Sequence, residues 1–172
     1  TAFVIQHPVN LGIGGAVQTG FKFARENDYD YAIQFDGDGQ HLSTEIPKIL
    51  SPVMSGECDS CIGSRFLDNN EEGFKSSASR RFGIGFFKYL NKLLLNQTIS
   101  DSTSGFRAYN KKTISFLARY YPTDYPEPET IVLLGKNNFV IKEVPVLMQE
   151  RQSGQSSISG FKPIYYMLKV SL

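Results

Sequence analysis

Two carboxylates spaced by one residue follow an apolar segment in the first quarter of the chain. Asp36 and Asp38 belong to the run Phe35-Asp36-Gly37-Asp38-Gly39-Gln40-His41. In a glycine-rich turn, both side chains can face one divalent cation. Mg²⁺ and Mn²⁺ prefer such oxygen ligands and leave coordination positions open for phosphate oxygens. The same residues would also suit an Asp-Gly turn that only ends a strand, so the spacing alone leaves both interpretations open.

Arginines recur in or beside the segments that we expect to be loops: Arg65, Arg80, Arg81, Arg107 and Arg151. A guanidinium group suits phosphate oxygens because it can donate two parallel hydrogen bonds. Each arginine taken singly is more often a solvated surface charge. Asp101, which stands just before an apolar segment, would by itself be interpreted as a turn or cap residue.

Two further patterns have a plain structural interpretation beside a functional one. The run 10–15 is rich in glycine and could cradle a phosphate, but Val17 occupies the third glycine position of the dinucleotide-binding pattern. Glycines that allow a helix to pack closely on a sheet are the commoner case. Cys58 and Cys61 could be half of a zinc site or a redox pair. We expect them instead to be small residues leading into a buried strand, in a reducing compartment.

The motifs gain specificity when they are taken together and in order. They are Asp36-x-Asp38, Gly63-Ser64-Arg65, Asp101-x-x-Ser104-Gly105-Phe106-Arg107, Glu127-x-Glu129, Glu143-Val144-Pro145-Val146 and Glu150-Arg151-x-x-Gly154-x-Ser156. The set resembles a family 2 glycosyltransferase of the GT-A fold, and is most similar to the polyprenyl-phosphate branch that includes the dolichol-phosphate mannosyltransferases. The resemblance spans nearly the whole chain.

One part of the family pattern is missing from this sequence. The family opens with a strand ending in a Tyr/Asn-Glu motif and a second strand ending in Asp-Asp-Gly-Ser, and these segments bind the nucleoside of the sugar donor. Neither motif is present between Thr1 and Leu172. The resemblance therefore implies that the chain starts just after the nucleoside-binding segment of a longer protein.

The resemblance implies an inverting, metal-dependent glycosyltransferase (a hexosyltransferase) that takes a sugar from a nucleotide-sugar donor. Asp36 and Asp38 would hold Mg²⁺ or Mn²⁺ on the donor diphosphate, with Gln40 near that shell. The acceptor would be a polyprenyl phosphate or, as an alternative, a saccharide hydroxyl. The role would lie in cell-envelope or glycan synthesis, in the cytoplasm at the inner face of the membrane.

The resemblance also assigns candidate roles to the remaining residues. Asp101 matches the position of a candidate base, although it could instead orient the sugar or an arginine, because a lipid phosphate is already ionised at neutral pH. Glu127 and Glu129 are the competing carboxylates, and a hydroxyl acceptor would need one of these three as a true base. We take Asp101 and Glu129 as the catalytic candidates. The predicted substrate-binding residues are Arg65, Arg80, Arg81, Arg107, Glu127, Arg151 and Ser156.

The elements that must position these residues alternate along the chain. We expect strands at 3–5, 31–35, 60–63 and 106–109, and a strand pair or one bent strand at 139–148, broken at Pro145. Helices are expected at 16–26, 82–96, 111–119, from within 121–129 to 134, and at 161–172. A further helix, capped by Ser43 or Thr44 and with Pro47 in its first turn, is expected to run to about residue 54. Polar residues 67–79 could form a mobile flap. The pattern predicts an α/β sandwich with a mainly parallel sheet flanked by helices, and sites beyond the carboxyl ends of its strands.

We expect a catalytic domain over residues 1–160 and an amphipathic helix over 161–172. The helix could face the core or lie beside the membrane, and the resemblance favours the membrane. Composition fits one globular domain, with 172 residues, 41% hydrophobic and 20% charged. A formal net charge of +1 gives no electrostatic drive toward nucleic acid, and no apolar stretch is long enough to cross a bilayer.

Two other function classes account for less of the sequence. Asp-x-Asp-Gly also resembles the haloacid-dehalogenase phosphatases, in which the first Asp is a nucleophile. Those enzymes have Thr or Val at the position of Gln40. They also have two adjacent acidic residues further along the chain, and this sequence has no such Asp-Asp pair. A non-catalytic sugar-nucleotide-like module is the third interpretation, and the intact acidic and arginine positions argue against it.

Overall fold

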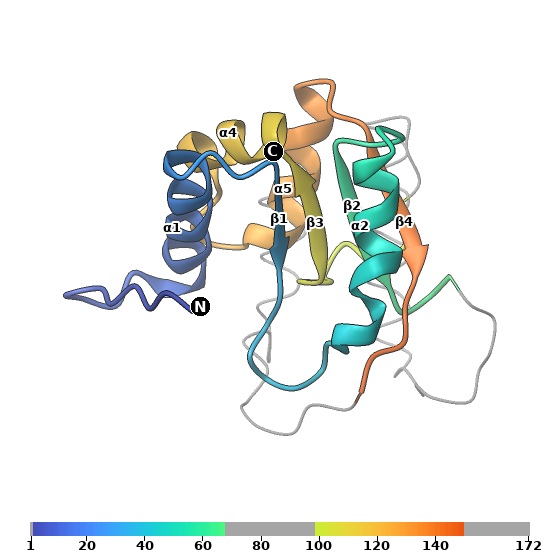
Figure 1. Ribbon diagram of the computed structural model, residues 1–172, viewed down its shortest axis with the longest axis horizontal. Coiled ribbons are helices and arrows are strands. Elements are labelled where there is room, and N and C mark those ends of the chain that lie inside the picture. Colours follow the sequence, from blue (N-terminus) through green and yellow to red (C-terminus); the bar gives the residue numbers. More distant parts are fainter. Residues whose placement is uncertain (1, 68–98, 150–172) are drawn as a thin grey trace.

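A sheet with helices on both faces forms the centre of the molecule (Figure 1). The computed structural model describes residues 2–67 and 99–149. Within them the strands are β1 (Tyr31–Gln34), β2 (Ser60–Ser64), β3 (Arg107–Asn110) and β4 (Ile141–Pro145), in the order β1-β3-β2-β4. The helices are α1 (Gly12–Glu26), α2 (Ile46–Met54), α4 (Lys111–Tyr120) and α5 (Pro126–Lys136), and a 3₁₀ turn, η1 (Ser43–Glu45), precedes α2. The predicted α/β class is confirmed.

Strand direction differs in part from the expected mainly parallel sheet. β1, β2 and β4 run the same way, but β3 lies antiparallel between β1 and β2, so among the described strands only β2 and β4 pair in parallel. The reason is that the chain leaves β2 and enters β3 at the same end of the sheet, where Arg65 contacts Asp101. A strand that starts at the end of the sheet where its neighbour finishes must be antiparallel to that neighbour.

Each face of the sheet packs against its own helices, because side chains alternate along a strand. Ala108 faces α2, together with Ile49 and Val53, in one buried cluster. Its neighbour Tyr109 faces the other way, where α1, α4 and α5 contribute a second cluster that includes Phe21, Ile114, Leu117, Ile131 and Leu134. Figure 1 shows α2 on the opposite side of the sheet from α1 and α4.

Several local predictions are corrected at the start of the chain. Residues 3–5 form no strand in the structure, and Phe3 and Val4 are 68% and 93% exposed. Helix α1 begins at Gly12 rather than at residue 16. Gly14 does permit close packing, because a Cβ there would lie 2.7 Å from the carbonyl oxygen of Pro122, although the neighbour is a loop and not the sheet.

The expected helix cap at Ser43 or Thr44 is wrong. These residues lie in η1, and α2 follows Glu45 without a side-chain capping bond, with a proline in its first turn as predicted. The buried Glu45 carboxylate accepts instead from Lys48 at 2.7 Å and from the backbone N–H of Leu147 at 3.1 Å. This contact ties the start of α2 to the chain that follows β4.

Buried positions agree with the plain interpretation of the cysteines. Cys61 lies in β2 and is fully buried, and Cys58 just before it is buried too; both thiols are free. The expected flap over 67–79, apart from Leu67, and the helices expected at 82–96 and 161–172 lie outside the described residues. In the described part of the chain, no helix combines the length and apolar character needed to cross a membrane.

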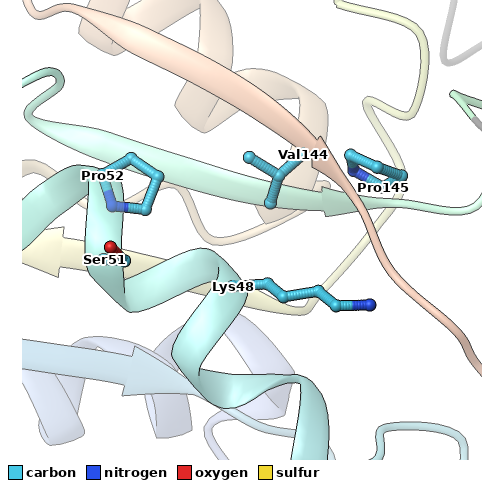
Figure 2. Close-up of a pocket in the computed structure, with 5 residues that line it drawn as sticks. All are labelled: Lys48, Ser51, Pro52, Val144 and Pro145. Carbon is cyan, nitrogen blue, oxygen red and sulfur yellow. The ribbon is translucent and has the colours of Figure 1, made fainter.

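A shallow hollow lies between α2 and β4. Figure 2 shows the five residues that line it: Lys48, Ser51 and Pro52 from the helix, and Val144 and Pro145 from the strand. None of the five belongs to the predicted site residues.

Asn110 joins β3 to α4 and offers a test of the fold. Its Oδ1 caps α4 by accepting from the Thr113 backbone N–H at 2.9 Å, and its Nδ2 donates to Asp59 at 2.9 Å. Asn110→Ala should lower the free energy of unfolding by about 1–2 kcal/mol, because the cap is lost. Urea denaturation measures this. Asn137→Ala, at an exposed position after α5, is the control, and an equal loss in both variants would contradict the capping role.

Candidate active site

Three segments meet at one end of the sheet. β1 ends at Gln34, which lies opposite Arg107 at the start of β3. β2 ends at Ser64, directly before Arg65. Because β3 is antiparallel, the residues that precede it, 100–105, lie where β1 and β2 end. We call residues 100–105 the Asp101 loop.

The turn that carries Asp36 and Asp38 is folded back on itself by local hydrogen bonds. The Asp36 backbone N–H donates to Nδ1 of His41 at 3.0 Å, and Oδ1 of Asp38 accepts from the Gln40 backbone N–H at 3.0 Å. Gly39 has φ +80°, a conformation that glycine adopts without strain. The predicted pair of carboxylates is therefore held on a short, internally bonded turn.

His41 supports this turn and was not among the predicted site residues. Its ring stacks on Phe106 with 4.9 Å between centroids, and Nε2 lies 3.8 Å from Oδ2 of Asp36. Burial lowers the pKa of His41 below its ordinary value, although the carboxylates of Asp36 and Asp38 act in the opposite direction. Because Nδ1 accepts a hydrogen bond, the neutral ring carries its proton on Nε2, toward Asp36. His41 stands close to Asp36 in the sequence, but its stacking partner Phe106 is distant along the chain, so the sequence alone does not indicate this support.

Gly105 makes room for the Asp36 side chain. A Cβ at this position would lie 2.5 Å from Oδ2 of Asp36, which is closer than real Cβ contacts come. The Asp101 loop therefore touches the turn of residues 35–41, which we call the carboxylate turn. The motif has glycine at position 105 because a larger residue would clash with Asp36.

Arg65, which is partly buried, and the buried Asp101 form an ion pair. The Nε and Nη2 atoms of Arg65 donate to the two carboxylate oxygens of Asp101 at 2.7 and 2.8 Å, and the Arg65 backbone N–H donates at 3.2 Å. Thr103 adds a hydroxyl donor at 3.2 Å. The Asp101 side chain has no exposed surface. Burial acts to lower the pKa of Arg65, but the hydrogen bonds and charge of Asp101 outweigh it and raise that pKa.

Arg107 is directed into the protein. Its guanidinium group donates to the carbonyl oxygens of Ser104 at 2.7 Å, Ser102 at 3.0 Å and Glu127 at 2.8 Å, and the residue is 1% exposed. A substrate-binding role for Arg107 stays a prediction, and these contacts favour an internal role that joins the Asp101 loop to α5.

The two glutamates of the predicted set lie in the first turn of α5. Burial raises the pKa of the Glu127 carboxyl; the charge of Arg107 opposes this shift, and that of Asp36 adds to it. Glu127 thus lies within electrostatic range of the carboxylate turn. The predicted catalytic role of Glu129 stays a prediction.

The chain after β4 returns to the carboxylate turn. Met148 forms a β-bridge with His41, and the Gln149 backbone N–H donates to the carbonyl oxygen of Gln40 at 2.9 Å. The described part of the chain therefore ends beside Asp36 and Asp38. Arg80, Arg81, Arg151 and Ser156 lie outside the described residues.

The donor set fits a cation that shares its shell with a substrate. Among residues 2–67 and 99–149, no three His, Cys, Asp or Glu side chains converge in a way that could hold a metal. Mg²⁺, however, is often bound through one or two carboxylates, with substrate phosphates completing the shell. Asp36 and Asp38 supply such a pair of carboxylates on one turn.

The contact between Gly105 and Asp36 can be tested by adding one methyl group. Gly105→Ala should lower the free energy of unfolding by about 1–3 kcal/mol, because the new Cβ displaces the Asp36 carboxylate or the loop. Urea denaturation measures the change. Gly37→Ala is the matched control, since a Cβ at Gly37 meets nothing within 4 Å. Equal stability of the two variants would show that the loop and the turn do not touch.

Comparison with known proteins places this site in a family. The sequence profile described as Glycosyl transferase family 2 matches residues 2–116. A UDP-N-acetylglucosamine–dolichyl-phosphate N-acetylglucosaminyltransferase of Methanococcus voltae is 30% identical, over 98% of this chain and 69% of its own length. An undecaprenyl-phosphate mannosyltransferase of Micrococcus luteus is 28% identical, over 91% of this chain and 65% of its own.

A third relative extends the comparison to another genus. A polyprenol monophosphomannose synthase of Mycolicibacterium smegmatis is 28% identical, over 98% of this chain and 64% of its own length. The profile match sets aside the phosphatase alternative and agrees with the resemblance seen in the ordered motifs. The chain belongs to glycosyl transferase family 2.

Proposed function

We propose that this protein transfers a sugar from a nucleotide-sugar donor to a polyprenyl phosphate, with inversion at the anomeric carbon. The names of three relatives support the acceptor class, because each refers to a dolichyl, undecaprenyl or polyprenol phosphate reaction. The polar end of the sheet, with its carboxylate turn and Arg65, supports a site for phosphate-bearing substrates.

The observation that carries the choice of acceptor is the state of Asp101. Its carboxylate accepts three hydrogen bonds from Arg65 and one from Thr103, and its side chain is fully buried. A carboxylate held in this way is poorly placed to take a proton from an acceptor. A saccharide hydroxyl needs such a base, whereas a phosphate is already ionised at neutral pH. The geometry thus argues against Asp101 as that base and favours a phosphate acceptor, with Asp101 orienting Arg65.

On the donor side, we assign Asp36 and Asp38 to Mg²⁺ or Mn²⁺, with Gln40 near that shell. When bound, the cation would offset charge that develops on the diphosphate leaving group. The protein's own contribution is to hold Asp36 in place: its backbone N–H is bonded to His41, and Gly105 leaves space for its carboxylate.

The remaining charges would bind the phosphates. Arg65 presents a guanidinium group whose orientation is fixed by Asp101. One of Arg80 and Arg81 is proposed as a further phosphate ligand, together with Arg151, which belongs to the ordered motifs. Arg151 follows Gln149, which is bonded to the carboxylate turn. A lipid acceptor also implies that the reaction takes place at a membrane surface, for which we propose the cytoplasmic side.

In the proposed reaction, an oxygen of the acceptor phosphate attacks the anomeric carbon of the donor sugar. The new carbon–oxygen bond forms as the bond to the nucleoside diphosphate breaks, and the leaving group takes the bonding electrons. Because the acceptor oxygen carries no proton, the step needs no general base. The protein has to bring the two anionic substrates together and hold them in line.

The acceptor class can be tested directly. The intact protein is given a panel of nucleotide sugars with Mn²⁺ and one of three acceptors: a polyprenyl phosphate, the corresponding free polyprenol, or an oligosaccharide. We expect a lipid-linked sugar from the polyprenyl phosphate and no product from the free polyprenol. Faster transfer to the oligosaccharide would instead support the hydroxyl acceptor and a base role for one of the carboxylates.

The metal assignment gives a second test. Asp36→Asn and Asp38→Asn should each lower the transfer rate at least about a hundredfold while circular dichroism stays unchanged, because one of few carboxylate ligands is lost. Excess EDTA should abolish transfer in the wild type. Asp30→Asn, an exposed position just before β1, is the control and should keep full activity. Full activity of either variant, or of the wild type in EDTA, would rule out a metal bound by these residues.

A further inference from the structure

Glu143 contacts the Asp101 loop from the neighbouring edge of the sheet. It lies on β4, opposite Ile62 of β2. Its Oε2 accepts from the Ser100 backbone N–H at 2.7 Å, and its Oε1 accepts from the Asp101 backbone N–H at 2.6 Å. The Ser100 hydroxyl lies 2.9 and 3.1 Å from the two oxygens. One side chain therefore holds two consecutive backbone amides.

The donors around Glu143 require a carboxylate. Two backbone N–H groups each donate to a different oxygen of Glu143. The side chain must therefore offer two acceptor oxygens, as a carboxylate does. Glutamine has nearly the same shape but replaces one oxygen with an NH₂ group. That group would face a backbone N–H and leave it without an acceptor. A buried donor left in this way destabilises its local conformation.

Glu143 and Arg65 hold the same residue from two sides. Glu143 bonds the backbone of Asp101, and Arg65 bonds its carboxylate. The Ser100 hydroxyl also lies 3.2 Å from that of Ser64, the residue before Arg65. A shift of the loop away from Glu143 would therefore move the carboxylate that orients Arg65. Figure 1 shows β2 and β4 side by side, so that Glu143 on β4 lies near the end of β2, where Arg65 follows.

We propose that Glu143 is a positioning residue of the transfer site: it fixes the backbone of Ser100 and Asp101, and through Asp101 the guanidinium group of Arg65. The inference rests on the proposed function, since it assigns Arg65 to substrate phosphate. Glu143 touches no substrate in this scheme. Its effect on the reaction passes entirely through the Asp101 loop.

The first experiment compares, in the intact protein, Glu143 on β4 with Glu57 in the exposed turn between α2 and β2. Glu143→Gln should lower kcat roughly ten- to a hundredfold, in line with the loss of a charged hydrogen bond, and should change the donor KM by less than about threefold. Glu57→Gln is the matched control, because Glu57 is exposed and pairs with Lys142, next to Glu143. It should leave kcat unchanged. Equal kcat in wild type and Glu143→Gln would overturn the proposal.

A double-mutant cycle separates positioning from a general loss of stability. Arg65→Lys keeps the charge but loses the bidentate fork. If Glu143 acts through Arg65, then Glu143→Gln should lower kcat by less than about threefold further in the Arg65→Lys background. Full additivity of the two effects would overturn the proposal. If Glu143→Gln does not fold, Ser100→Ala replaces it: a severalfold loss of kcat, absent in the Arg65→Lys background, supports the proposal, and unchanged kcat overturns it.

Amide hydrogen exchange gives a readout that does not depend on activity. In Glu143→Gln, or in Ser100→Ala if that variant is used, the amide of Asp101 should exchange at least about tenfold faster than in wild type, and that of Thr113 should not change. If the wild type transfers no sugar to any acceptor, the proposed function fails. The positioning of the loop by Glu143 is then decided by exchange alone: faster exchange at Asp101 supports it, and an unchanged rate overturns it.

Discussion

The ion pair between Arg65 and Asp101 determines how the functional end of the sheet is assembled. Removing two charges from water is offset only when the pair has good geometry and further hydrogen bonds. Here Arg65 makes a bidentate contact with Asp101, and the Arg65 backbone N–H and the Thr103 hydroxyl add two more hydrogen bonds. Removing one partner would leave a buried charge, at a cost of about 3–5 kcal/mol. The pair therefore fixes the point at which the chain re-enters the sheet and begins β3.

The direction of β3 follows from this fixed point, and the rest of the site follows from the direction of β3. Its first residues lie beside the end of β1, which brings Gly105 against Asp36. Arg107 then binds carbonyl oxygens on both sides of itself, in the Asp101 loop and at Glu127. The loop carbonyls of Ser102 and Ser104, which no strand or helix satisfies, are paired in this way. The carboxylate turn, the loop and α5 are thus joined by one continuous set of polar contacts.

Much of the architecture could be predicted from the sequence, because apolar periodicity and turn residues mark where elements begin and end. The strands ending near Phe35 and Ser64 and the helix 111–119 were predicted close to their observed bounds. The direction of β3 could not be predicted, since it depends on where a long connection returns. Residues 3–5 have the composition of a strand, but strand formation also needs a pairing partner, and none pairs with them in the described structure.

The candidate site divides in the same way. The position of Asp36 and Asp38 at the end of a strand was visible from local residues. The roles of the arginines were not, because a guanidinium in a loop-like segment can face solvent or backbone carbonyls, and only the fold decides. Arg107 was predicted to bind substrate and is 1% exposed. The stacking of His41 on Phe106 and the contacts of Glu143 with Ser100 and Asp101 join residues far apart in the sequence, so local residues could not predict them, although Glu143 belongs to one of the ordered motifs.

The joined ends of β2 and β3 have a consequence for how such enzymes can diverge. The chain leaves the described structure after Leu67 and returns at Ile99, and the contacts of Arg65 and Ser64 with Asp101 and Ser100 close this interval at its base. Each of these contacts joins two described residues, so the ends of β2 and β3 are held together by the residues that flank the interval. Because the entropy of closing a loop grows slowly with its length, by about 0.6 kcal/mol for each doubling, flanking contacts of this kind tolerate connections of different length.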